Sequence, residues 1–267
     1  MTKTRSSELV RLELGHTKWL EGDCSFPADR SDFAVAYIHG FGSIRDGEKA
    51  KALAVSCANR NWPFAAFDFR GHGKSSGRMR DVRPSQLLED LEAIRGFLTG
   101  RGVQRLCLVG SSMGGWAAAW FTLQHPKTTV GCALIAPALR FPSARWDRLT
   151  PEEREEWRRN GAVRITNEWV DAELGYGVAE EIPQFPHELL VEAMNTPTLI
   201  FHGLQDAIVP AAQSITFTQQ AKMRHIDLHV FKDGDHRLTS RRYEIAEAAC
   251  NFFDRLLHGN PDEVQLV

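Results

Sequence analysis

Long hydrophobic runs and paired cysteines are both missing from this 267-residue sequence. No stretch approaches the ~18 consecutive apolar residues typical of a membrane-spanning helix. The charged segment 1–15 lacks the apolar core of a secretory signal peptide. The five cysteines include no Cys-X-X-Cys pair, which argues against a disulfide framework and against a zinc site. We therefore expect a cytoplasmic protein with no integral membrane segment.

A strong excess of charge of either sign is also missing. The chain has 32 Lys and Arg against 34 Asp and Glu, a formal net charge of −2. Such a chain offers no electrostatic footprint for nucleic acid or for an anionic membrane. Hydrophobic residues at 43% and charged residues at 25% are ordinary for a globular protein, and the length fits one α/β domain.

The most informative feature present is the segment 106–115, LCLVGSSMGG. It begins as a short apolar strand pattern, continues into a Gly-rich turn and precedes a predicted helix. It contains Gly-X-Ser-X-Gly, the sequence of a nucleophile elbow, in which a serine occupies a strained strand-to-helix turn. Only Ser112 has glycines two positions away on both sides, at Gly110 and Gly114; Ser111 does not. The motif alone can also occur in an ordinary Gly-rich turn. The assignment of Ser112 as nucleophile therefore requires a base and an acid elsewhere in the chain.

A serine hydroxyl needs a base to take its proton and an acid to hold that base. Asp206 follows the apolar strand pattern at 197–202, and His236 follows the pattern at 226–231 in a Gly-containing loop. Ligand and catalytic groups collect at such strand ends in open α/β sheets. The chain order Ser, Asp, His matches the order known for nucleophile elbows of this kind. We predict Ser112, Asp206 and His236 as a catalytic triad.

Other residues compete for these roles. Asp233 and Asp235 are too close in sequence to His236 to reach its far ring nitrogen easily, and Asp171 could serve only if the acid came from an inserted segment. Most of the ten histidines are expected to be surface or packing residues and not the base. Those beside glycines at strand ends, such as His202, are expected to stabilise turns.

Two backbone amides are expected to form an oxyanion hole. One is the amide of Met113, which directly follows the nucleophile. The other is that of Phe41, in the HGFG turn after the apolar strand pattern at 33–38. Glycines on both sides of Phe41 allow the backbone to bend so that its N–H faces the site.

Five segments together resemble the α/β-hydrolase superfamily. They are HGFG at 39–42, FDFRGHGKS at 67–75, GSSMG at 110–114, HGLQDAIVP at 202–210 and GDH at 234–236. The resemblance covers nearly the whole chain and implies a serine hydrolase. The segments DAIVP at 206–210, DHR at 235–237 and LTPEE at 149–153 are similar to the acyl-protein thioesterase and acyl-glucuronide esterase group. In the superfamily, the segment from Asp68 to Ser75 is structural.

The alternation of strand and helix patterns predicts an α/β fold. We expect the α/β-hydrolase fold, a mostly parallel sheet flanked by helices, with an edge hairpin at 8–20. The other strands are expected near 33–39, 63–68, 105–110, 130–135, 197–202 and 226–231. Helices are expected at 46–60, 84–100, 114–125, 211–222 and 240–257.

An insert interrupts this alternation. Residues 1–137 and 195–267 are expected to form the hydrolase core, and residues 138–194 a helical cap over the site. Thr150 to Glu153 is a capping box that opens a charged helix through Arg159. The insert is rich in aromatic residues, most of which are expected to anchor it, while an aromatic roof would also exclude water and accept an apolar acyl group. These aromatic residues are Phe141, Trp146, Trp157, Trp169, Tyr176 and Phe185.

The sequence thus predicts a serine esterase or thioesterase that acts on small-molecule acyl esters or thioesters through an acyl-enzyme. No metal or organic cofactor is implied. A lactone hydrolase, a C–C bond hydrolase and a perhydrolase remain open because they use the same triad. A non-catalytic ligand-binding protein on this scaffold is the other alternative, and it predicts loss of a triad member. The sequence leaves the acyl group, the leaving group and the oligomeric state open.

Overall fold

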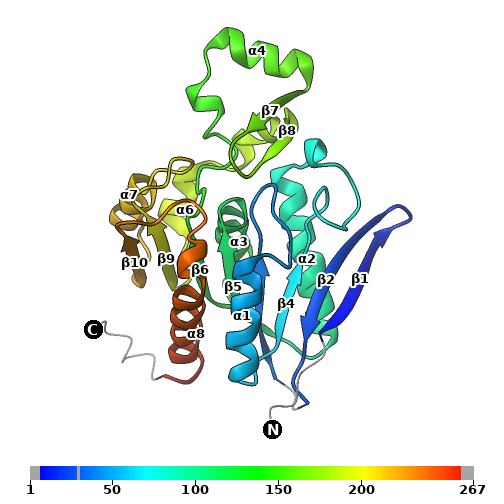
Figure 1. Ribbon diagram of the computed structural model, residues 1–267, viewed down its shortest axis with the longest axis vertical. Helices are drawn as coiled ribbons and strands as arrows, with labels where there is room; N and C mark the ends of the chain where they lie inside the picture. The colour runs from blue at the N-terminus through cyan, green and yellow to red at the C-terminus, as the bar shows by residue number, and fades with distance from the viewer. Residues whose placement is uncertain (1–6, 29–30, 260–267) are drawn as a thin grey trace.

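A computed structural model describes residues 7–28 and 31–259 of the chain (Figure 1). Eight strands of this part form one sheet in the order β1-β2-β4-β3-β5-β6-β9-β10. The six strands from β4 to β10 are parallel, while β1 and β2 pair antiparallel at one edge. The strands are β1 (Glu8–Gly15), β2 (Lys18–Ser25), β3 (Phe33–Ile38), β4 (Phe64–Phe67), β5 (Arg105–Ser111), β6 (Thr129–Ile135), β9 (Thr198–Gly203) and β10 (Ile226–Phe231).

Helices cover both faces of the sheet. Helices α1 and α8 pack together on one face, while α2, α3 and α7 lie on the other (Figure 1). The central strands are buried on both sides, so their side chains alternate between two apolar clusters. In β5, for example, Leu106 and Leu108 face α3, and Cys107 and Val109 face α1 and α8. The helices are α1 (Glu48–Asn59), α2 (Pro84–Gly100), α3 (Met113–Gln124), α7 (Ala212–Gln220) and α8 (Arg242–His258).

The strand order places a switch point between β3 and β5. The chain runs from β3 to β4 on one side, then returns to add β5 on the other side of β3. The loops that leave β3 and β5 therefore diverge to opposite faces of the sheet, and such a crevice is where open α/β sheets bind ligands. These two loops contain Phe41 and Ser112.

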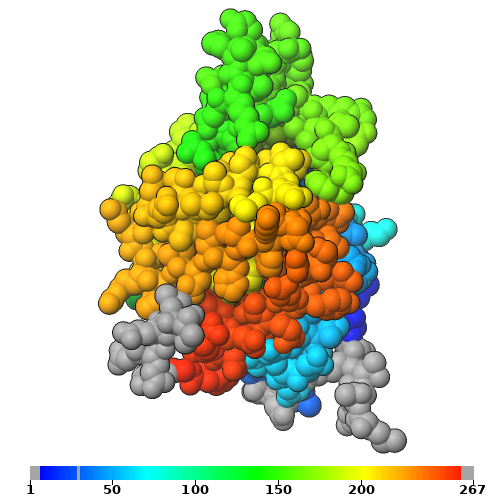
Figure 2. Space-filling view, turned by 60° about the vertical axis from the view of Figure 1, so that its left-hand side comes forward, coloured from blue at the N-terminus to red at the C-terminus, as the bar shows by residue number. Residues whose placement is uncertain are grey.

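The insert stands at the top of the molecule in Figure 1, above the middle of the core, and the space-filling view shows it in green at the top (Figure 2). The predicted charged helix is confirmed as α4 (Pro151–Asn160), with its capping box between Thr150 and Glu153. A hairpin of β7 (Ala162–Thr166) and β8 (Asp171–Gly175) was not expected, so the insert is not purely helical. It ends with α5 (Gly177–Glu180) and α6 (His187–Ala193), of which α6 contacts α3.

The predicted strands and core helices are confirmed within a few residues. The hairpin expected at 8–20 is longer than predicted and consists of two full strands that end at Ser25. In the described part of the chain, no helix is both long and apolar enough to cross a bilayer.

Candidate active site

Ser112 occupies the tight turn between β5 and α3. Its backbone has φ 54° and ψ −116°, a conformation that is strained for any residue with a side chain. A Cβ on Gly110 would collide with the carbonyl group of Gly114, and a Cβ on Gly114 would collide with the carbonyl oxygens of Ile38 and His39. Glycine is therefore required at both positions for the turn to pack against β3.

The structure brings Ser112, His236 and Asp206 into one hydrogen-bonded chain. The Ser112 Oγ lies 3.0 Å from Nε2 of His236, so the hydroxyl can donate to that nitrogen. Nδ1 of His236 lies 2.7 Å from Oδ2 of Asp206. Since an ionised carboxylate only accepts, Nδ1 carries the proton and Nε2 is left free to accept one. This is the arrangement in which a base can activate a hydroxyl.

Asp206 is buried and receives four hydrogen bonds. The amides of Ile208 and Val209 donate to Oδ1 at 2.9 and 2.8 Å. Oδ2 is bonded by His236 and by Nε2 of His202, which lies at 3.1 Å. Burial by itself would raise the pKa of Asp206, but the hydrogen bonds from His202 and His236 outweigh it and hold the pKa below its ordinary value. The carboxylate therefore stays ionised beside His236.

Two glycines let the loops that carry Asp206 and His236 lie against each other. A Cβ on Gly203, at the end of β9, would collide with the backbone of Gly234. The Gln205 amide donates to the Gly234 carbonyl oxygen at 2.9 Å, which joins the two loops. This contact fixes the distance between acid and base.

The competing aspartates have other partners. Asp171 lies in the exposed β7–β8 hairpin and pairs with Arg164 at 2.5 Å. Asp233 pairs with Arg241, and Asp235 accepts from the amide of Leu238. Of these residues, only Asp206 hydrogen-bonds to His236.

The turn after β3 lies directly beside the nucleophile. A Cβ on Gly40 would lie 3.8 Å from the Ser112 Oγ and 3.1 Å from its Cβ. The Ser43 amide donates to the Gly40 carbonyl oxygen and closes the turn that contains Phe41. Met113 begins α3, where the first amides have no intrahelical acceptor. Within residues 7–28 and 31–259, the amides of Phe41 and Met113 have no backbone acceptor, so both can donate to a ligand.

Comparisons with known proteins agree with this geometry. A family model described as serine aminopeptidase, S33, matches residues 29–160. The mitochondrial palmitoyl-protein thioesterase ABHD10 of Bos taurus is 25% identical over 213 residues, which cover 78% of this chain and 68% of the relative. The chain has the α/β-hydrolase fold.

Solved structures show the same fold. The α/β hydrolase domain-containing protein 10 from mouse superposes with a TM-score of 0.80 at 22% identity and covers 93% of this chain and 99% of its own. Est1E from Butyrivibrio proteoclasticus with bound ferulic acid also has a TM-score of 0.80, at 19% identity, with the same coverage of 93% and 99%.

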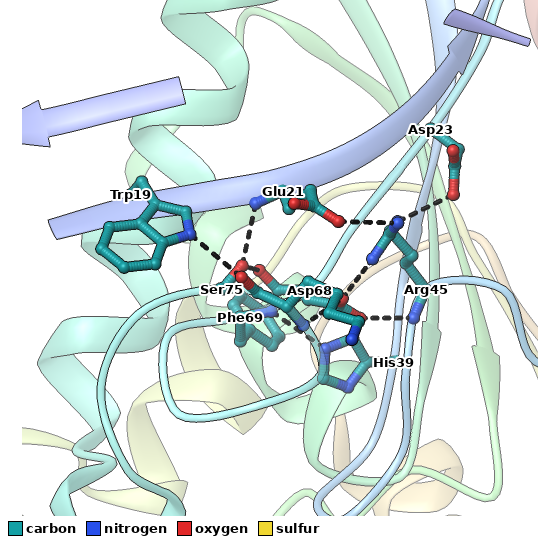
Figure 3. Close-up of polar contacts among 9 residues, drawn as sticks. Trp19, Glu21, Asp23, His39, Arg45, Asp68, Phe69 and Ser75 are labelled. Atoms are coloured by element: carbon teal, nitrogen blue, oxygen red, sulfur yellow. Dashed lines mark hydrogen bonds and ion pairs between the residues drawn. The ribbon is translucent and has the colours of Figure 1, made fainter. Parts of the chain in front are cut away.

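A polar network supports the turn after β3 (Figure 3). The Arg45 guanidinium contacts three carboxylates, those of Glu21, Asp23 and Asp68. Asp68 is fully buried and also accepts from the amide of Arg45 at 2.7 Å. The network ties the β1–β2 hairpin to the loop after β4, and no sequence pattern indicated the central role of Arg45.

The same loop holds the strand end before Phe41. The Phe69 amide donates to Nε2 of His39 at 3.0 Å, while burial lowers the pKa of His39. Ser75 joins this loop to β2, because its Oγ donates to the Asp68 carbonyl oxygen and accepts from the Glu21 amide (Figure 3). These contacts agree with the structural role expected for the segment from Asp68 to Ser75.

The insert contacts the turn after β3. A Cβ on Gly42, which has φ +70°, would lie 2.7 Å from a methyl group of Val170 in the β7–β8 turn. Phe41 packs against the main core and also against the small apolar cluster inside the insert around Trp157 and Leu174. The insert therefore lies next to the turn that borders Ser112.

Most aromatic residues of the insert pack either against α3 or against one another. Phe185 packs against Trp116 and Trp120 of α3, with ring centroids 5.2 and 5.1 Å apart. Inside the insert, Tyr176 meets the rings of Trp146 and Trp157. These rings join the insert to α3 and hold its own elements together.

Proposed function

We propose that this α/β-hydrolase is a serine esterase or thioesterase that cleaves small acyl esters or thioesters through an acyl-enzyme. The observation that carries the proposal is the continuous hydrogen-bonded chain Ser112–His236–Asp206 at a strained turn. Strain of this kind is retained where the surrounding structure holds a functional group in place.

In the acylation step, the Ser112 Oγ attacks the carbonyl carbon of the substrate while Nε2 of His236 takes the hydroxyl proton. Asp206 keeps the imidazole in the required tautomer and stabilises the imidazolium that forms. Collapse of the tetrahedral intermediate expels the alcohol or thiol, which receives the proton from Nε2. The products of this step are the first leaving group and an acyl ester of Ser112.

In the deacylation step, water replaces the leaving group. Nε2 of His236 takes a proton from the water as its oxygen attacks the acyl carbonyl, and the second tetrahedral intermediate then releases Ser112. The proton returns to the Ser112 oxygen, so the enzyme is regenerated and a carboxylic acid leaves. The two steps balance with the protein's own side chains, the substrate and water.

The amides of Phe41 and Met113 are proposed to hold the negative oxygen of both intermediates. Support comes from their positions on either side of the nucleophile and from the lack of a backbone acceptor for either amide in the described part of the chain. Fixed donors aimed at developing charge typically contribute about a hundred- to a thousand-fold in rate each.

The preference for an acyl ester or thioester is supported by the relatives. The bovine relative is named a palmitoyl-protein thioesterase, and the Butyrivibrio structure contains ferulic acid. The insert beside Phe41 supplies an apolar cluster that could exclude water and border an acyl group.

A fluorophosphonate probe tests the proposal. It should label the wild-type protein on Ser112, and Ser112→Ala should abolish both labelling and hydrolysis of p-nitrophenyl esters and acyl-thioesters. Ser111→Ala is the matched control, since its hydroxyl has no place in the triad, and it should keep most activity. Labelling that persists in Ser112→Ala would show that another residue is the nucleophile.

A further inference from the structure

His202 is a buried histidine that lies against the acid of the triad. It is the fifth residue of β9, and its side chain has no exposed surface. Its neighbours in the strand, Phe201 and Leu199, face α8, so His202 points to the opposite face, toward α7. There it contacts Asp206 and Val209 in the loop after β9 and Ser214 in α7.

The contacts of His202 define its tautomer. Nε2 lies 3.1 Å from Oδ2 of Asp206 and 2.9 Å from the carbonyl oxygen of Val209. Both partners only accept, so Nε2 must carry the proton. Nδ1 lies 2.7 Å from the Oγ of Ser214, whose hydroxyl can donate to it. Every polar atom of the buried ring is thus satisfied in the neutral form with the proton on Nε2.

This arrangement completes the set of donors around Asp206. Oδ1 is held by the amides of Ile208 and Val209, and Oδ2 is shared between His202 and His236. The two amides bind Oδ1 only, so the contacts of Oδ2 depend on its own donors. His202 is a second donor to Oδ2 beside His236, and Ser214 holds its ring in place.

We propose that His202 is a positioning residue that holds Oδ2 of Asp206 toward His236, an inference that rests on the proposed function. It acts on the acid and not on the substrate. Ser214 has a supporting role, because its hydroxyl keeps the His202 proton on the nitrogen that faces Asp206. We therefore expect that another side chain can replace His202 if it places an N–H at the position of Nε2.

The test compares His202→Leu with His202→Gln. Leucine removes the donor, whereas the glutamine amide nitrogen can reach the position of Nε2 and donate to Asp206. A hydrogen bond to a charged group contributes about 1.5–3 kcal/mol, so His202→Leu should lower kcat about 10- to 100-fold. KM should change little, and the rate of fluorophosphonate labelling should fall in parallel. His202→Gln should recover most of the loss.

Proton NMR supplies a readout that does not need turnover. The Nδ1–H of His236, shared with Asp206, should give a far-downfield resonance in the wild type. That resonance should shift or broaden in His202→Leu and return in His202→Gln. If His202→Leu does not fold, Ser214→Ala carries the test, and it should cause a smaller loss of kcat with the same direction of change in the resonance.

The outcomes are distinct. Equal kcat in the wild type and His202→Leu, or in the wild type and Ser214→Ala where leucine prevents folding, would overturn the role of His202. A loss of kcat that glutamine does not rescue, with the downfield resonance unchanged, would also overturn it. A wild-type protein that neither hydrolyses esters nor takes up the probe would instead overturn the proposed function.

Discussion

The loops that carry Ser112, Asp206 and His236 are held in place by different kinds of contact from those of the insert. At the site, the contacts are between backbones: Gly114 lies against the end of β3, and Gly203 lies against Gly234. The insert meets the core largely through side chains, with ion pairs from Arg80 and Arg83 and with aromatic rings packed on α3, although Gly175 also lies against the Arg80 carbonyl oxygen.

From this difference we expect the loops to determine the rate of the reaction and the insert to determine the choice of substrate. Backbone contacts leave no room for an added atom, so the loops that carry the triad can adopt only one spacing. Side chains that make such contacts can be substituted without moving a strand. The residues of the insert that border the site can therefore vary while Ser112, Asp206 and His236 stay in place. The comparison predicts that substitutions at the loops act on rate or folding, and that substitutions in the insert act on substrate choice.

The largest expected effect is at the acid. Asp206→Asn should lower kcat by about 10⁴-fold, the loss known for the same change in a serine-protease triad, because the amide favours the wrong imidazole tautomer. Asp171→Asn, on the exposed hairpin of the insert, should leave kcat nearly unchanged. Steady-state kinetics on a p-nitrophenyl ester measures both. Full activity in Asp206→Asn would move the acid elsewhere.

Next is the backbone contact at the nucleophile turn. Gly114→Ala places a Cβ against the carbonyl oxygens at the end of β3, so it should reduce the free energy of unfolding by at least about 2 kcal/mol. Gly96→Ala is the control: Gly96 lies inside α2 with open space around it, and alanine there should stabilise by about 0.5–1 kcal/mol. Urea unfolding gives both values. Equal stability of the two variants would remove the argument that the turn is tightly packed.

A smaller effect is expected where the insert meets α2. Glu181 is buried and accepts from both the amide and the hydroxyl of Ser85 at 2.8 Å. Glu181→Gln replaces one acceptor by a donor and should cost about 1–2 kcal/mol. The exposed pair Arg80–Glu173 offers the contrast, because Glu173→Gln should cost less than about 0.5 kcal/mol.

Unfolding curves measure both effects, and limited proteolysis should cleave the insert faster in Glu181→Gln than in Glu173→Gln. The reverse order would mean that the exposed pair is the stronger anchor.

The smallest effect concerns the acyl group. If the insert borders an apolar pocket, kcat/KM should rise with acyl length until the pocket is filled. Each buried methylene contributes about 0.8 kcal/mol, roughly fourfold in kcat/KM. A series of p-nitrophenyl esters from acetate to octanoate tests this. A flat series would exclude a long acyl pocket and leave the triad untouched.

The sequence was most informative where a local rule acts. The buried strands were predicted because each is a short apolar run, and α4 was predicted because Thr150 and Glu153 form a capping box. The β7–β8 hairpin was missed because its strands are short, only partly buried and carry few apolar residues in a row. The support of α2 by Glu181 was missed because it joins residues that are distant in the chain.

His202 shows the same limit inside the candidate site. The sequence interpretation placed it as a turn-stabilising residue because it stands beside a glycine at a strand end. It does stabilise that turn through Val209, but it also donates to Asp206, and this contact depends on α7 packing under the loop.

By itself, the sequence determined the strained turn at Ser112, the buried strands and the positions of Ser112, Asp206 and His236 after three of these strands. These follow from short-range rules: glycine where a Cβ would collide, apolar runs in strands, and loops at strand ends. Tertiary structure alone decided that His236 reaches both Ser112 and Asp206, that His202 completes the donors around the acid, and that the insert lies on the turn after β3. The physical reason is that hydrogen bonds and close packing depend on distances of a few ångströms between strands, and spacing along a chain does not define those distances.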